Sequence, residues 1–240
     1  MSFRRALAAL TVLLALALAL PASAQHGAGV QQVLQRARAA SGGAAWNAVR
    51  GYHEVGTENG RPYERWVDLV RWGERIENGA ATAEVVQGYN GFGLWWLPLS
   101  TPRPPGTDTE LMRRARSDAY FAAYGYYFPG RFDVRSSRLG VRPSGGRDYD
   151  VVRIQPAGGE PRELWFERAT GRLGRMVEGG SNQPKTTEFA DYRKVGRLML
   201  PFQVTIYGQG RARPDERRLE RIELVSPDRA MFSLPRVPAP

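Results

Sequence analysis

The stretch that decides the fold is GYHEVGTENGRPYERWVDLVRWGERIENGAATAEVVQGYNGFGLWWL, residues 51–97. It consists of short runs separated by the pairs Asn59-Gly60, Asn78-Gly79 and Asn90-Gly91. Asn-Gly is the preferred centre of a two-residue hairpin because both residues tolerate positive φ. Three such pairs in one stretch predict an antiparallel meander with strands at 51–58, 61–70, 71–78, 82–89 and 91–97.

The second half of the chain again consists of short runs separated by turn residues, after one segment of a different pattern. Small, glycine-rich turns follow one another, and Phe202, Val204 and Ile206 alternate with more polar residues, as in a half-buried strand. These patterns predict seven more strands, at 131–142, 148–156, 162–168, 172–179, 185–195, 198–208 and 217–225.

Two segments show helical spacing instead. Apolar residues from Val30 to Ala40 form a stripe that ends at Gly42 and Gly43. After the proline-rich segment 98–107, a second helix begins at Thr107 or Asp108 and ends before Gly125. A sheet of about a dozen strands must curl or close. We therefore expect a mainly β (α+β) fold: an incomplete antiparallel β-barrel of eleven to twelve strands, covered by an N-terminal helix and an inserted helix.

The first residues predict export. A basic start precedes the apolar stretch 6–20, and small residues stand at positions 22 and 24, so residues 1–24 are typical of a signal peptide. A membrane anchor is the alternative, but the apolar stretch is shorter than the ~20 residues that a span needs. We expect residues 25–240 to form a single half-barrel domain with a proline-rich tail from about 227.

Composition limits the remaining options. The chain has no cysteine, which excludes disulfides, thiol catalysis and lipid attachment to a cysteine. We therefore expect a periplasmic protein that is soluble, not lipid-anchored, and without an integral membrane segment once the signal is removed. The net charge of +10 is almost all arginine and is spread along the chain. This pattern predicts no nucleic-acid partner, although a basic surface favours anionic headgroups or acidic polymers.

Catalytic motifs are absent from the sequence. There are two histidines, His26 and His53, with no HExxH spacing, and there is no GxSxG. We predict no catalytic residue, no metal site, no cofactor and no enzyme activity. Asp148 and Asp150 would share one strand face, and a carboxylate-dependent hydrolase built on them is the remaining catalytic alternative.

Aromatic residues are the best candidate ligand site. Several gather on either side of the insert 98–123. One interpretation is that they fill the core under the inserted helix; the other is that they line an apolar cavity whose lid is that helix. The residues predicted to line the cavity are Trp95, Trp96, Tyr126, Tyr127 and Phe128.

Five segments resemble a bacterial periplasmic domain similar to the outer-membrane lipoprotein-sorting carriers: ARAASGGAAWNAVRGYHEVGT (37–57), QGYNGFGLWW (87–96), AYGYYFPGRF (123–132), YDVVRIQPAGGEPRELWFERATGRLGRMVE (149–178) and TTEFADYRKVGRLMLPFQVTI (186–206). The domain also resembles one that precedes some retroviral-type aspartyl proteases. Here Asp108-Thr109 is followed by Glu110 and not by the glycine such a protease needs, so no protease activity is carried over. The resemblance implies an incomplete barrel wrapped on helices, with an apolar cavity that accepts acyl chains.

The leading hypothesis is a non-enzymatic periplasmic protein that binds an apolar ligand, such as a lipid or an acylated peptide, in the half-barrel cavity. The segment 98–107 and the inserted helix would move as a lid. The rival hypothesis is an interaction module whose core is filled by its own side chains and which contacts a protein partner in the periplasm.

Overall fold

A computed structural model describes residues 27–79, 85–97, 109–179, 184–208, 210 and 212–233. The predicted signal peptide, the proposed lid segment 98–107 and the end of the proline-rich tail, 234–240, lie outside the described residues. Within the described helices and strands, the side chains of Trp96 and three other residues also lie outside the described structure. None of the helices in the described ranges is both long and apolar enough to cross a membrane.

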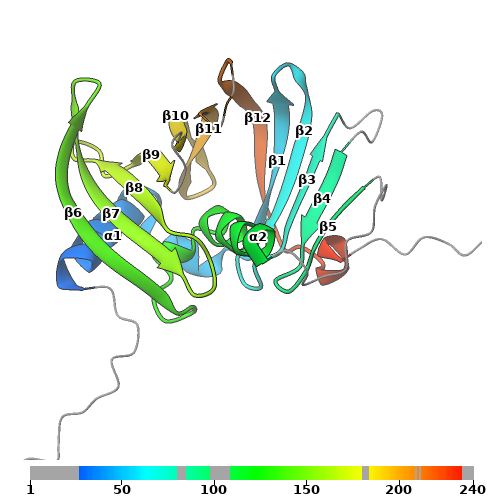
Figure 1. The fold of residues 1–240 in the computed structure, drawn as a ribbon, viewed down its shortest axis with the longest axis horizontal. Coiled ribbons are helices and arrows are strands. Elements are labelled where there is room, and N and C mark those ends of the chain that lie inside the picture. The colour runs from blue at the N-terminus through cyan, green and yellow to red at the C-terminus, as the bar shows by residue number, and fades with distance from the viewer. Residues whose placement is uncertain are drawn as a thin grey trace, which may run out of the picture.

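One antiparallel sheet carries all twelve strands, in the order β5-β4-β3-β2-β1-β12-β11-β10-β9-β8-β7-β6. β5 and β6 are the two edges, so the described sheet does not close into a barrel. Figure 1 shows it bent into an arch with α2 (Thr109–Ala122) between its two halves. The predicted mainly β, incomplete barrel is confirmed. The strands are β1 (Gly51–Glu58), β2 (Arg61–Asp68), β3 (Glu74–Asn78), β4 (Val85–Tyr89), β5 (Leu94–Leu97), β6 (Val134–Ser144), β7 (Arg147–Pro156), β8 (Arg162–Glu167), β9 (Leu173–Glu178), β10 (Lys185–Val195), β11 (Leu198–Tyr207) and β12 (Asp215–Val225).

The two halves of the sheet meet through strands that are distant in sequence. β1 pairs with β12 from Gly51↔Val225 to Glu58↔Arg217, with one register shift between Val55 and Gly56. A Cβ at Gly56 would lie 2.1 Å from a carbonyl oxygen of β12, so the close approach requires glycine. This pairing places the concave faces of both halves opposite each other.

The Asn-Gly pairs differ in the turns they make. Asn59 and Gly60 have φ of 53° and 78° and join Glu58 directly to Arg61, as expected for a two-residue hairpin. Asn90 begins a longer loop, in which its side chain accepts hydrogen bonds from the backbone N–H groups of Phe92 (2.9 Å) and Gly93 (2.8 Å). The prediction that a strand begins at residue 71 was wrong, because Asp68 caps a turn over residues 69–71 and β3 begins only at Glu74.

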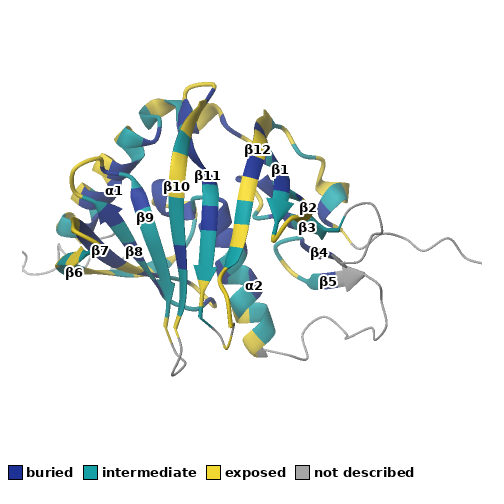
Figure 2. Ribbon diagram, turned by 90° about the horizontal axis from the view of Figure 1, so that it is seen from above, coloured by how far each residue is buried: buried dark blue, intermediate teal, exposed yellow. Residues whose placement is uncertain are grey.

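All of the helices except the last cover the concave side. α1 (Ala28–Ala40) buries the predicted stripe, Val30, Val33, Leu34 and Ala37, and contacts β6 and β7. A short 3-10 helix, η1 (Gly43–Ala48), follows and contacts β11. η2 (Gly125–Tyr127) follows α2, and η3 (Arg229–Phe232) packs against β3. Figure 2 shows buried, intermediate and exposed residues along the same central strands, as expected for a sheet with one covered face.

Candidate functional site

A cavity of about 330 Å³ lies between α2 and the concave face of the sheet. Strands from both halves of the arch contribute to its wall, as do α2 and the residues just after it. Part of the wall is apolar and is formed by Ile76, Phe121, Leu173, Met176, Phe189, Val204 and Ile206. The rest is polar and charged, so the concave face is not the uniformly apolar surface that the sequence pattern predicts.

One charged group, which we call the Arg65 cluster, comes from β1, β2, β3 and β12. Its members are Glu54, Glu58, Tyr63, Arg65, Glu74 and Arg217. Arg65 donates from Nε (2.8 Å) and Nη2 (2.5 Å) to one oxygen of Glu74. Arg217 donates in the same way to Glu58, at 3.0 and 2.5 Å, and its guanidinium lies 3.9 Å from the centre of the Tyr63 ring. Both arginines are therefore held by carboxylates and remain charged.

Burial and pairing act in opposite directions on these arginines. Burial lowers the pKa of Arg65, but Glu74 and the other acidic groups around it, Tyr52, Tyr63 and Glu54, together outweigh burial and the pKa is raised. For Arg217, burial again lowers the pKa, and Tyr63 and Glu58 reverse the shift. The cavity wall therefore carries fixed charges at any pH near neutrality.

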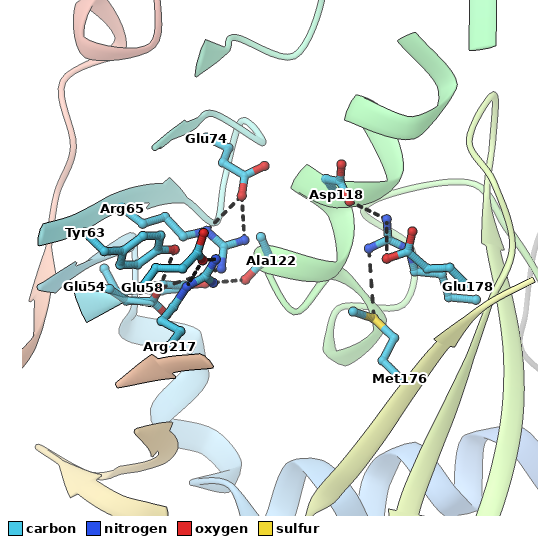
Figure 3. Close-up of polar contacts among 12 residues, drawn as sticks. Glu54, Glu58, Tyr63, Arg65, Glu74, Asp118, Ala122, Met176, Glu178 and Arg217 are labelled. Carbon is cyan, nitrogen blue, oxygen red and sulfur yellow. Dashed lines mark hydrogen bonds and ion pairs between the residues drawn. The ribbon is translucent and has the colours of Figure 1, made fainter. Parts of the chain in front are cut away.

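A second group, the Arg162 cluster, joins α2 to β8, β9 and β10. It consists of Asp118, Arg162, Glu178 and Lys185. Arg162 is 3% exposed and binds Asp118, with Glu178 at 3.3 Å. Lys185 Nζ lies 2.7 Å from the same Glu178 oxygen. Figure 3 shows Asp118 and Glu178 across the cavity from the Arg65 cluster.

Four tyrosines line the wall as well: Tyr52, Tyr124, Tyr126 and Tyr192. The Tyr52 hydroxyl donates to the carbonyl of Ala122 (2.8 Å), and that of Tyr192 donates to the carbonyl of Leu173 (2.6 Å). Burial raises the pKa of all four hydroxyls, so they stay neutral donors. The cavity therefore presents aromatic faces beside its charges.

No protein-family model matches the chain, and no curated protein matches its sequence. Solved structures do match its fold. A LolA superfamily protein from Nitrosomonas europaea aligns with a TM-score of 0.60 at 14% identity, over 85% of this chain and 97% of that one. A putative outer membrane lipoprotein-sorting protein domain from Vibrio parahaemolyticus aligns with a TM-score of 0.54 at 13% identity, over 80% and 90%.

The chain has a LolA-like fold. A DUF1329 family protein from Desulfovibrio piger shares it, with a TM-score of 0.51 at 11% identity over 85% of this chain and 97% of that one. At these identities the likeness concerns the fold alone. The expected resemblance to lipoprotein-sorting carriers is confirmed at that level.

In this LolA-like fold the four predicted lining residues whose side chains are described lie in different places. Tyr126 lines the cavity. Tyr127 and Phe128 are buried in the main core, where Tyr127 packs 5.4 Å from the Trp46 ring. Trp95 is 7% exposed, and its Nε1 donates to the carbonyl of Phe232 (2.8 Å), away from the residues that line the cavity. A ligand-binding role for the five residues stays a prediction.

The sequence analysis did not predict the charged residues of the cavity wall, because a single charged residue in a strand has the same pattern as a solvent-exposed one. One signal was present: Arg65 lies between Tyr63 and Val67 at the two-residue period of β2, and both neighbours are 0% exposed. A charge between two buried residues of one face points inward. The Arg162–Asp118 pair, 44 residues apart in sequence, had no comparable signal.

The two carboxylates of the hydrolase alternative do not face each other in a cleft. Asp148 is exposed, whereas Asp150 is buried beneath α1 and accepts hydrogen bonds from Arg36 and Arg138. Burial raises the pKa of Asp150, but those two arginines outweigh it and the pKa is lowered. Asp150 therefore anchors α1 to the sheet. The described residues contain no group of three or more His, Asp or Glu side chains arranged to hold a metal ion.

Proposed function

We propose that this protein is a non-enzymatic, exported carrier that binds an apolar ligand, a lipid or an acylated peptide, in the cavity under α2. The proposal treats residues 25–240 as one binding domain and residues 1–24 as its signal peptide, with the periplasm as its compartment. The observation that carries it is the cavity of about 330 Å³ on the concave face of a LolA-like fold.

The cavity has the size and the surface for one chain-like ligand. Its volume is at the lower end of the roughly 300–1,000 Å³ of small-molecule sites. Each methylene that leaves water for the apolar wall contributes about 0.8 kcal/mol. About ten methylenes against Phe121, Phe189 and Ile206 and the rest of the apolar wall would contribute about 8 kcal/mol, which corresponds to micromolar affinity.

The ion pairs are compatible with an apolar ligand because they neutralise one another. Arg65 and Glu74, and Arg217 and Glu58, bind within the wall and need no partner from the ligand. Such pairs keep their charges satisfied while a chain passes over them. They also keep the cavity walls apart, because a buried charge cannot collapse into an apolar core without a large desolvation cost.

The decisive experiment is extraction of the purified protein followed by lipid mass spectrometry, together with titration of the stripped protein with a fatty acid by calorimetry. Ile206 lines the cavity, whereas its neighbour Thr205 points to the other face of β11. Ile206→Arg should weaken binding about tenfold or more, and Thr205→Arg should leave it unchanged. A protein that yields no lipid and binds no fatty acid refutes the proposal.

A second candidate is a protein-interaction module without a small ligand. The observation favouring it is that β5 and β6 end the sheet, and β6 offers an edge of eleven residues. An extended segment of a partner adds to such an edge through backbone hydrogen bonds. A ligand-free protein that captures a periplasmic partner, and loses it when Arg135 or Ser137 of β6 is replaced by proline, would favour this function.

A further inference from the structure

The charges that line the cavity do not balance. Among the described residues, four cations line it, Arg65, Arg162, Lys185 and Arg217, against six carboxylates, Glu54, Glu58, Glu74, Asp118, Glu178 and Asp215. The lining thus has a net charge of −2, whereas the whole chain has a net charge of +10. The cavity is an acidic region in a basic protein, and a low-dielectric wall strengthens its field.

Glu54 is the carboxylate with the weakest pairing in the Arg65 cluster. It is 9% exposed. It accepts a long hydrogen bond from the Tyr63 hydroxyl (3.4 Å), and Arg65 Nη1 lies 3.7 Å away. Arg65 uses its Nε and Nη2 for Glu74. A buried carboxylate needs a close cation, and Glu54 lacks one at hydrogen-bond distance in the described structure.

Tyrosine rings lie beside this carboxylate. Tyr52 is two residues before Glu54 on the same face of β1, and its ring centre is 6.3 Å from that of Tyr124. Glu54 and both tyrosines line the same cavity. Burial raises the pKa of Tyr124, and the negative charge of Glu54 raises it further. A carboxylate and aromatic rings in one cavity offer an ammonium group both an anion and π-faces.

One unpaired hydrogen-bonding atom in the wall agrees with this polarity. Asn78 Oδ1 is a buried acceptor that has no hydrogen-bond partner in the described structure. Arg162 Nε is an unpaired donor, but Arg162 is bound to Asp118 and Glu178. An anion that approached Arg162 would meet these two carboxylates. A cation at Glu54 would meet the Arg65 guanidinium, but that guanidinium is bound to Glu74, and its Nη1 is 3.7 Å from Glu54.

We propose that the ligand is a cationic amphiphile, whose ammonium group pairs with Glu54 against the rings of Tyr52 and Tyr124 while its hydrocarbon chain lies on the apolar wall. This inference rests on the proposed function and names the headgroup that the same cavity selects. The ammonium hydrogens are the donors that Glu54 lacks, and the aromatic faces accept its charge.

The test compares three probes with the same twelve-carbon chain: dodecylammonium, dodecyl sulfate and dodecyl maltoside. Each is titrated into the full mature protein by calorimetry at pH 7, below its critical micelle concentration. We expect dodecylammonium to bind about tenfold or more tightly than dodecyl sulfate, with the neutral maltoside between them. Glu54→Gln should reduce this preference about tenfold. Glu64→Gln, on the opposite face of β2, should leave it unchanged.

The outcomes separate the two proposals. If none of the probes binds, the proposed function fails. If all three bind but dodecyl sulfate binds as tightly as dodecylammonium, the carrier function stands and the cationic headgroup is refuted. An undiminished ammonium preference in Glu54→Gln, with a native circular dichroism spectrum, also refutes the role of Glu54. The comparison of headgroups on the unmodified protein needs no variant to fold.

Discussion

Replacement of Arg162 by methionine should show how strongly the cavity wall depends on its ion pairs. The variant keeps much of the alkyl stem and removes the guanidinium, whose central carbon lies 4.9 Å from the centre of the Phe121 ring. Asp118 on α2 and Glu178 on β9 then lose their shared cation. Removing one partner of a buried ion pair lowers the free energy of unfolding by about 3–5 kcal/mol. Arg162 is 3% and Glu178 11% exposed, but Asp118 is 36% exposed and regains water. We therefore expect Arg162→Met to lower the free energy of unfolding by about 3 kcal/mol, the lower limit of that range.

The assay is urea unfolding at pH 7, followed by fluorescence, of the unmodified protein, Arg162→Met, Asp118→Ala and the double variant. The double-mutant cycle should give a coupling energy of about 1–2 kcal/mol, since Asp118 is partly screened by water. A loss below about 1 kcal/mol for Arg162→Met, or a coupling energy near zero, would contradict the claim that this pair holds α2 on the sheet.

The pH dependence provides an independent check. Burial raises the pKa of Asp118, but the charge and hydrogen bond of Arg162, together with the charge of Lys185, outweigh burial and the pKa is lowered. A lowered native pKa contributes stability that is present above the unfolded value of about 3.9 and is lost as the pH falls through the native value. The penalty of Arg162→Met should therefore be full at pH 7 and smaller near pH 3. A penalty of equal size at both pH values would refute the reasoning.

Two further predictions concern the supports of the cavity. Asp150→Asn should cost about 2 kcal/mol in urea unfolding at pH 7, because two charge-assisted hydrogen bonds to α1 and β6 weaken. The exposed Asp148→Asn on the same strand is the matched control, and the two variants should converge as the pH falls below about 3.9, since the native pKa of Asp150 is lowered. Gly88→Ala should cost about 1–3 kcal/mol, because a Cβ there would lie 2.3 Å from the Trp95 ring. The cost should fall in a Trp95→Leu background, and an equal cost in both backgrounds would show that the ring is not the obstacle.

The sequence by itself determined the secondary structure and the class of fold. The two-residue alternation of Phe202, Val204 and Ile206, and the Asn59-Gly60 turn, depend on neighbours within a few residues. Helix α1 could also be predicted from local sequence, because its apolar stripe and the glycines that follow it lie next to each other in the chain. From these elements an open, curved sheet followed, since so many antiparallel strands must bend.

Only the tertiary structure decided what the concave face presents. Arg65 and Arg162 face the cavity because α2 and two halves of the sheet, joined by β1 and β12, bring carboxylates from distant positions to them. Local patterns record that a residue is charged, but its burial depends on partners that the chain supplies from far away. Trp95 shows the same dependence on distant residues: its Nε1 donates to the carbonyl of Phe232, 137 residues later in the chain.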